Sequence, residues 1–212
     1  MTPHDPHLPR AAHRSRHPRA PWPLVPWLLA AAACGGGDTA VAADFSIGVG
    51  AGVDRGRAEC ADPFACDRSS GYGKLEAGIR FGVAGEAGEA RAVFFDAGRF
   101  KGGGTTPLGT RFGGAFEVAG LGLAGAYRWA LAPQWSAGAR AGIAVVRTRF
   151  EYADAALARV SKTTVQPLVG VDIGLALTSD LSLRLELDLT RFKVHTSHGG
   201  LRMFGLAVQH SF

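Results

Sequence analysis

The sequence predicts an all-β fold: an eight-stranded antiparallel transmembrane β-barrel with up-and-down meander topology. Three observations lead to this prediction. After Asp44, apolar and polar residues alternate with a period of two, which is the repeat of a β-strand with two unlike faces. The connections between these segments are alternately short and long. Glycines concentrate on the more polar face of the segments.

The first two strands are expected at 45–53 and 74–83. Phe45, Ile47 and Val49 share one face of the first segment, opposite serine and glycine. The second segment alternates in the same way, with lysine, glutamate, arginine and glycine opposite leucine, alanine, isoleucine, phenylalanine and valine.

The next two strands, at 89–100 and 116–129, have a weaker pattern. The first is rich in β-forming residues, but Arg91 and Asp96 fall on opposite phases of the alternation. A β-bulge is therefore expected near residues 94–95, because one extra residue in a strand reverses its phase.

The last four strands are expected at 135–145, 169–177, 181–190 and 203–212. Leucine occupies every second position from Leu181 to Leu189, opposite serine, arginine, glutamate and aspartate. This strict alternation places all of these leucines on one face of a strand.

The connections support the same topology. Short turns are expected at 84–88, 132–134 and 178–180, and long loops at 55–70, 101–110, 147–163 and 193–200. Tight turns at one end and longer loops at the other are typical of transmembrane barrels. Pro63 and Pro107 fall in loops and Pro133 in a turn. Pro167 is expected at the outer end of a strand, where no central ladder bond is lost.

Residues 1–43 are expected to be a cleaved signal peptide, which leaves 44–212 as the barrel domain. Four arginines precede an apolar stretch from Leu24 to Ala33, and small residues ending at Ala43 follow. This order is typical of a secretory signal. A disordered tail or a membrane anchor is the alternative, but the stretch is interrupted by proline and too short to span roughly 30 Å of hydrocarbon.

Cys34 offers a different processing site. The run Ala-Ala-Ala-Cys-Gly resembles a lipoprotein signal, in which the cysteine would be lipidated and become the first residue. Ala31 stands three positions before it, where leucine is expected in such signals. Ordinary cleavage near Ala43 is therefore favoured.

The net charge gives no support for nucleic-acid binding. The formal charge of the whole chain is +5, but the leader carries four arginines against two aspartates, so about +3 remains after its removal. The remaining charge is mild and dispersed along the chain, unlike the clustered basic surface of a nucleic-acid-binding protein.

Glycine placement predicts which face of the strands lines the lumen. A soluble ligand-binding barrel would bury the leucines and leave its polar face unconstrained. Here the polar face carries many glycines, among them Gly48, Gly138 and Gly170. An eight-stranded lumen is only wide enough for side chains, so small residues must make room for long charged ones. The polar face is therefore predicted to be the inside, which favours a membrane barrel over the soluble alternative.

The charged residues of this face are expected to form a buried network inside the barrel. Its predicted members are Lys74, Glu76, Arg80, Arg128, Arg140, Asp172, Arg184, Glu186 and Asp188. Their charges are nearly balanced, as burial requires, because an unpaired buried charge is costly. The alternation of sign favours a plugged barrel over a conducting pore.

Aromatic residues and cysteines add two further expectations. Tyr127, Trp129 and Trp135 bracket the second short turn, at the height of a periplasmic aromatic girdle. Cys60 and Cys66 lie close together in a polar loop without a nearby histidine, so a disulfide is favoured over a metal site. The closed loop would stabilise by roughly 2 kcal/mol.

Several segments resemble the small outer-membrane β-barrel family that includes the transmembrane domain of OmpA, OmpX and the opacity-type proteins. They are Gly-Tyr-Gly-Lys-Leu-Glu-Ala-Gly-Ile-Arg-Phe-Gly at 71–82, Leu-Arg-Leu-Glu-Leu-Asp-Leu-Thr-Arg-Phe at 183–192 and Phe-Gly-Leu-Ala-Val-Gln-His-Ser-Phe at 204–212. The last segment is also similar to the signal read by the barrel-assembly machinery, with Phe204, Leu206, Val208, His210 and Phe212 at alternate positions. His210 stands where an aromatic residue is commoner.

One further segment has an enzymatic resemblance. His195-Thr196-Ser197 is similar to the His-x-Ser pattern of lipid A deacylases, which are also eight-stranded barrels. In those enzymes an acidic residue in the last strand orients the histidine, as serine nucleophiles generally require. No acidic residue follows Asp188, and His198 stands where an asparagine is expected.

The sequence therefore predicts a non-enzymatic outer-membrane scaffold, without cofactor, whose loops serve envelope integrity, adhesion or host-factor binding. The resemblance implies outer-membrane lipid, lipopolysaccharide and the barrel-assembly machinery as partners, with an extracellular ligand for the loops. The enzyme and the soluble periplasmic barrel are the alternatives.

Overall fold

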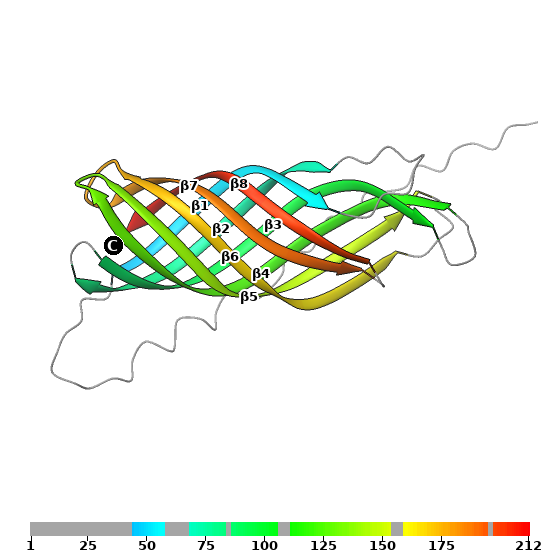
Figure 1. Cartoon of the computed structure of the whole chain (residues 1–212), viewed down its shortest axis with the longest axis horizontal. Coiled ribbons are helices and arrows are strands. Elements are labelled where there is room, and N and C mark those ends of the chain that lie inside the picture. Colours follow the sequence, from blue (N-terminus) through cyan, green and yellow to red (C-terminus); the bar gives the residue numbers. More distant parts are fainter. Residues whose placement is uncertain (1–43, 58–67, 84–85, 106–110, 154–158, 195–196) are drawn as a thin grey trace, which may run out of the picture. The chain divides into compact units, whose positions relative to one another are not determined.

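Eight strands between Asp44 and Ser211 form a closed antiparallel barrel and are joined in sequence order (Figure 1). The structure, a computed structural model, describes residues 44–57, 68–83, 86–105, 111–153, 159–194 and 197–212. The strands are β1 (Asp44–Arg57), β2 (Ser69–Val83), β3 (Glu86–Thr105), β4 (Arg111–Ala132), β5 (Trp135–Tyr152), β6 (Val160–Ala176), β7 (Leu181–Val194) and β8 (Ser197–Ser211). The predicted fold class is confirmed.

Closure of the barrel depends on β1 and β8, which lie furthest apart in sequence. Twelve registered pairs join them, from Ser46 opposite Ser211 to Arg57 opposite Gly200. Because every strand then has two neighbours, no open edge remains to pair with another chain. The C-terminus lies at the end of the barrel where the turns are short (Figure 1).

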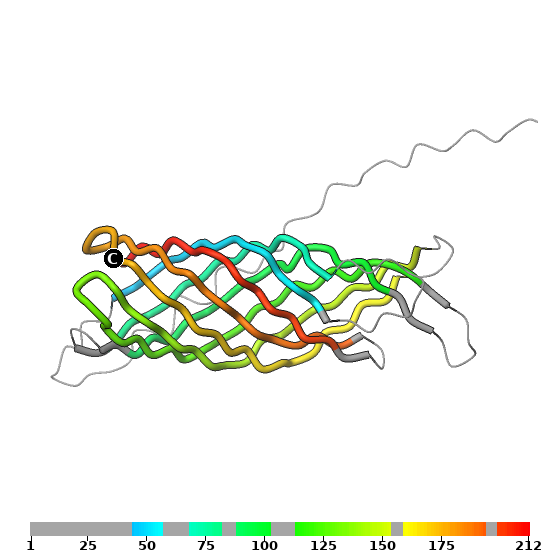
Figure 2. The backbone as a smooth tube through the Cα atoms, turned by 45° about the horizontal axis from the view of Figure 1, so that its top comes forward, coloured from blue at the N-terminus to red at the C-terminus, as the bar shows by residue number. Residues whose placement is uncertain are grey.

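The strands extend well into the segments that the sequence had assigned to loops. β5 continues to Tyr152 and β6 begins at Val160, so most of the predicted loop 147–163 is strand. The loops predicted at 101–110 and 193–200 are shortened in the same way. At this end the green to yellow strands β4, β5 and β6 reach further than β7 and β8 (Figure 2).

A reversal of polarity explains this error. In the loop half of β5 the inward residues Val146 and Phe150 are fully buried, while the outward Arg149 pairs with Glu117 on β4. The same alternate positions face inward along the whole strand. In the loop half, however, the inward residues are apolar and the outward residues are charged, the reverse of the half nearer the short turns. This pattern is typical of a barrel in water, and a membrane needs only about 9–11 residues of each strand.

Two local predictions were wrong. The bulge in β3 lies at Gly98, where the register against β4 shifts between Ala97 and Arg99, and not at residues 94–95. Asp96 is simply exposed on the outer face, so its phase needs no bulge. Pro167 lies inside β6, not at its outer end. There its carbonyl accepts a hydrogen bond of 2.8 Å from the Thr190 hydroxyl.

Candidate functional site

The lumen contains an ion-pair layer in the half nearer the short turns. It is built from five cations and five anions, namely Lys74, Arg91, Arg128, Arg140, Arg184, Glu76, Glu89, Asp172, Glu186 and Asp188. Opposite charges are equal in number, so the layer as a whole is neutral. Neutrality is what a buried cluster requires, because each uncompensated ion would pay the full cost of desolvation.

Lys74 and Arg140 hold three carboxylates from two strands, β2 and β7, together. The Lys74 Nζ atom lies 3.0 Å from Glu76 and 2.8 Å from Asp188, and it also contacts Glu186. Arg140 reaches the same three carboxylates from β5, at 3.2 Å from Glu76, 3.4 Å from Glu186 and 2.5 Å from Asp188. These contacts join β2, β5 and β7 across the lumen.

Arg184 lies at the centre of the layer and is completely buried. Its guanidinium contacts Glu76 and lies 3.1 Å from Glu186. Gly48 on β1 lies beside it, and a Cβ there would stand 3.4 Å from the Arg184 Nη2 atom, in ordinary van der Waals contact.

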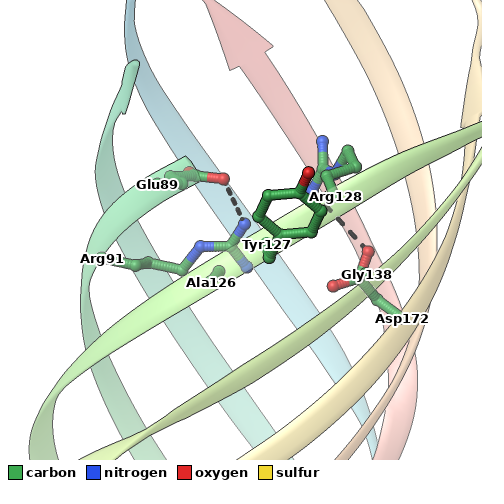
Figure 3. A pocket seen from close by; sticks show the side chains of 7 residues that line it. All are labelled: Glu89, Arg91, Ala126, Tyr127, Arg128, Gly138 and Asp172. Carbon is green, nitrogen blue, oxygen red and sulfur yellow. Dashed lines mark hydrogen bonds and ion pairs between the residues drawn. The ribbon is translucent and has the colours of Figure 1, made fainter. Parts of the chain in front are cut away.

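The layer ends toward the short turns in two further ion pairs (Figure 3). Arg91 lies 2.7 Å from Glu89 on the same strand, and Arg128 on β4 lies 3.6 Å from Asp172 on β6. The pocket that these four side chains border has no room for a water molecule. The layer is therefore filled at this end as well.

The structure differs from the predicted network at three residues. It adds Arg91 and Glu89, which were missed because a bulge was expected after them; both share the phase of Val93, which is a signal the sequence offered. Arg80 is only half-buried and takes part in none of the ion pairs between described residues. The other eight predicted members all lie in the ion-pair layer.

An aromatic layer fills the lumen on the loop side of these charges. It consists of Tyr72, Val93, Phe95, Ala97, Phe100, Phe116, Val118, Ala144, Val146, Phe150, Leu168, Phe192, Leu201 and Met203. Phe116 and Phe150 pack at a tilt of 48° with ring centroids 4.6 Å apart, and the Phe192 centroid lies 6.2 Å from that of Phe116. The sequence led us to expect a polar lumen throughout, and this layer was missed, although its members follow the inward phase of each strand.

The two layers together close the lumen to water. Arg184, Phe95 and Leu168 are each 0% exposed, so no internal channel wide enough for water reaches them. A water-filled porin would leave its lumen side chains solvated. Over the described residues the lumen is plugged, and it holds no cluster of three or more metal-ligating side chains.

Lumen glycines are expected to be intolerant of substitution, and Gly170 tests this. A Cβ at Gly170 would lie 2.6 Å from the Arg140 Nε atom and would also press on Asp188. Gly170→Ala should destabilise the barrel by roughly 1–3 kcal/mol, the usual cost of overpacking, as measured by urea unfolding in detergent. Gly125→Ala is the matched control, because a Cβ at Gly125 meets nothing within 4 Å. Equal effects of the two changes would contradict the packing argument.

The outer wall is apolar. Among the described residues, twenty-seven large apolar side chains are exposed, and every strand contributes some of them, with Leu123 at 60% and Ile143 at 60%. Soluble monomers rarely expose contiguous apolar patches beyond a few hundred Å². Tyr127 and Trp129 stand near the short-turn end of the wall with centroids 5.1 Å apart, and Trp135 follows the turn. The soluble-barrel alternative is therefore wrong, since the leucines lie outside and the charges inside.

Comparison with solved structures gives the same architecture. Neisserial surface protein A, from Neisseria, superposes with a TM-score of 0.52 at 12% identity, covering 79% of this chain and 97% of that protein. A major outer membrane protein from Thermus thermophilus superposes with a TM-score of 0.52 at 14% identity, covering 81% and 100%. This is the fold of the small outer-membrane β-barrels. No protein-family model and no curated protein matches the sequence.

In β8, the last strand of this outer-membrane-type barrel, residues that resemble the barrel-assembly signal lie on the outer face. Phe204, Leu206 and Val208 are exposed on the outer wall, at 49%, 53% and 41%. His210 packs edge-on against Phe212, with centroids 4.5 Å apart. The Phe212 amide donates a hydrogen bond of 2.8 Å to the Phe45 carbonyl, which fixes the C-terminal residue beside β1.

Three sequence expectations concern residues that the structure does not describe. The predicted disulfide between Cys60 and Cys66 falls in 58–67, and the signal peptide falls in 1–43. His195 also lies outside the described residues. Within the described residues, no helix is long and apolar enough to cross a membrane.

Proposed function

We propose that this protein is an exported, non-enzymatic scaffold of the outer membrane, which holds its loops at the cell surface for envelope integrity or for binding an adhesion or host factor. The observation that carries the proposal is the combination of an apolar outer wall with a lumen filled by fully buried side chains. The wall suits lipid, and the filled lumen leaves neither a solute path nor a ligand cavity at the level of the two layers.

The extracellular end is the one with the longer strands. Outer-membrane barrels have short periplasmic turns and longer outer loops, so the end bearing Phe212 and the turn at 133–134 faces the periplasm. The aromatic layer then lies under the extracellular loops. It gives them a rigid base, because packed side chains on several strands fix the positions of the strand ends. The partners of the barrel in this role are outer-membrane lipid, lipopolysaccharide and the barrel-assembly machinery.

Membrane integration is tested by heat modifiability. The mature protein should be recovered in detergent extracts of outer membranes and should migrate differently in gels before and after boiling, because an eight-stranded barrel stays folded in detergent until heated. Recovery as a soluble periplasmic monomer would contradict the proposal.

Sidedness is tested by adding trypsin to intact cells. Cleavage should occur after Arg68 or Arg159, which lie at the loop end, and the Arg159 side chain is 72% exposed. The barrel wall should survive as a folded core after cleavage. Protection of both sites in intact cells, with cleavage only after the outer membrane is permeabilised, would place the loops in the periplasm.

The cysteine pair provides a test of the compartment. Exported protein should resist thiol labelling at Cys60 and Cys66 until a reductant is added, because the two should be bridged in an oxidising environment. Removing both cysteines should leave heat modifiability unchanged, since the bridge would lie outside the barrel wall. Free thiols at both positions in exported protein would refute the bridge.

A further inference from the structure

Three adjacent strands each place an arginine at the same level of the outer wall, where the apolar part of the strand ends. On β1 the outward residue that follows Val53 is Arg55, and on β8 the one beyond Phe204 is Arg202. On β7 the outward residue after Leu189 is Arg191. Each arginine is exposed, and each apolar neighbour is part of the exposed wall. The arginines therefore mark the boundary between the apolar wall and the polar extension of the barrel.

The register brings these arginines side by side. Arg55 lies directly opposite Arg202 in the β1–β8 pairing, and both side chains point outward. Arg191 lies opposite Gly200 on β8, two positions from Arg202. Like charges that face each other across a pair of strands repel and destabilise the sheet. An anion bound between them would remove this repulsion.

Gly200 leaves an open space within the cluster. It faces outward between Arg191 and the end of β1, and a Cβ at this position would meet no atom within 4 Å. Any larger residue here would extend over the wall beside Arg191. The site therefore combines three positive charges with an open position on the outer surface of the wall.

The opposite side of the barrel is arranged differently. There two outward arginines have acidic partners: Arg149 lies 3.5 Å from Glu117, and Arg99 lies 2.5 Å from Glu151. No ion pair between described residues involves Arg55, Arg191 or Arg202. The charge on β7, β8 and β1 is therefore not neutralised within the described wall.

We propose that Arg55, Arg191 and Arg202 bind the phosphate groups of a phosphorylated glycolipid of the outer leaflet, with Gly200 as the floor of the site. The inference rests on the proposed function, because these side chains meet lipid headgroups only if the barrel is inserted with its loops outside. Guanidinium groups bind phosphate oxygens through paired, charge-assisted hydrogen bonds. The acyl chains of the same lipid would lie against Val53, Phe204 and Leu189.

The spacing favours a lipid with two phosphates over a single phosphodiester. The three arginines come from three neighbouring strands, so their backbones span two interstrand distances, about 10 Å in total. One phosphate cannot occupy the whole of this row. Two phosphates on one headgroup would engage both ends of it and neutralise the three charges together.

The experiment uses the folded mature barrel in detergent, titrated with bisphosphorylated lipid A and followed by native mass spectrometry. Each of Arg55→Gln, Arg191→Gln and Arg202→Gln should weaken binding about five-fold, and the triple variant about 100-fold, at about 1 kcal/mol per basic residue. Gly200→Leu should weaken binding without changing the charge, because the leucine side chain would occupy the open position beside the arginines. Dephosphorylated lipid A should bind the wild-type protein as weakly as the triple variant binds lipid A.

Two matched controls separate the site from general electrostatics. Arg99→Gln removes the same charge from an arginine paired with Glu151, and Gly125→Leu fills an equally open position on the other side of the barrel. Both should bind like the wild type. Equal loss with Arg99→Gln, or equally tight binding of phosphatidylglycerol, would overturn the proposal. Heat modifiability is measured on every variant. If the barrel integrates but the arginine variants bind lipid A as tightly as the wild type, only the proposed binding site is refuted. If the wild-type protein does not integrate into the membrane, the proposed function is refuted.

Discussion

Replacing Arg184 by leucine is expected to lower the free energy of unfolding by about 3–5 kcal/mol, the usual cost of breaking one partner out of a buried charge pair. Arg184 is 0% exposed, and it contacts both Glu76 and Glu186. Without it, five carboxylates would face four cations within the ion-pair layer. Leucine supplies neither charge nor hydrogen bonds, so one carboxylate loses its compensation in a space that water does not reach.

The neighbouring residue provides the control for this experiment. Leu185 is 41% exposed on the outer wall. Leu185→Ala removes a lipid-facing side chain and leaves no cavity, because lipid fills the space, so it should cost only about 1 kcal/mol of transfer free energy. Urea unfolding of both variants in lipid vesicles or detergent measures the two changes. If Leu185→Ala proves more damaging than Arg184→Leu, the assignment of inside and outside is wrong.

Phe95→Ala is expected to have a similarly large effect in the aromatic layer, about 3–5 kcal/mol, because it deletes a buried ring from a closely packed cluster. The Phe95 side chain is 0% exposed. It packs over Gly120, where a Cβ would stand 2.7 Å from the Phe95 Cε1 atom. Since Gly120 provides no side chain on β4 that could fill the space of the Phe95 ring, loss of the ring leaves a cavity.

Phe94 gives a matched comparison one residue away. Its ring is 46% exposed on the opposite face of the same strand. Phe94→Ala should cost much less than Phe95→Ala in the same urea titration, because lipid replaces its contacts. A larger effect at Phe94 would show that β3 carries the bulge near residues 94–95 after all, with the faces exchanged beyond it.

The sequence was sufficient to predict the barrel, its strand number and the side that faces the lumen. Leu181 to Leu189 show why: strict alternation over a whole strand assigns each residue to a face, and eight such strands fix the order of the meander. Most of the ion-pair layer followed from the same rule. The predicted network omits Glu89 and Arg91, because the opposite phases of Arg91 and Asp96 predict a bulge in this strand and leave its facing unassigned.

Strand length was harder to predict, because polarity along a strand depends on the surroundings of the barrel as well as on its faces. Beyond the lipid, Arg149 and Glu117 face water and Phe150 faces a packed interior. In sequence this resembles a polar loop with occasional aromatic residues. The alternation with a period of two continues through this segment, but here the inward face is apolar and the outward face is charged. The predicted strands therefore end too early.

The sequence by itself determined which side chains share a face, since alternation is a local property of the backbone. Only the tertiary structure decided which faces meet. Closure of β1 on β8 places Arg55 opposite Arg202, although the two lie at opposite ends of the barrel sequence. The lumen likewise brings Lys74 within 2.8 Å of Asp188, across 114 residues. Such contacts depend on the register and closure of the whole barrel, which no single strand specifies.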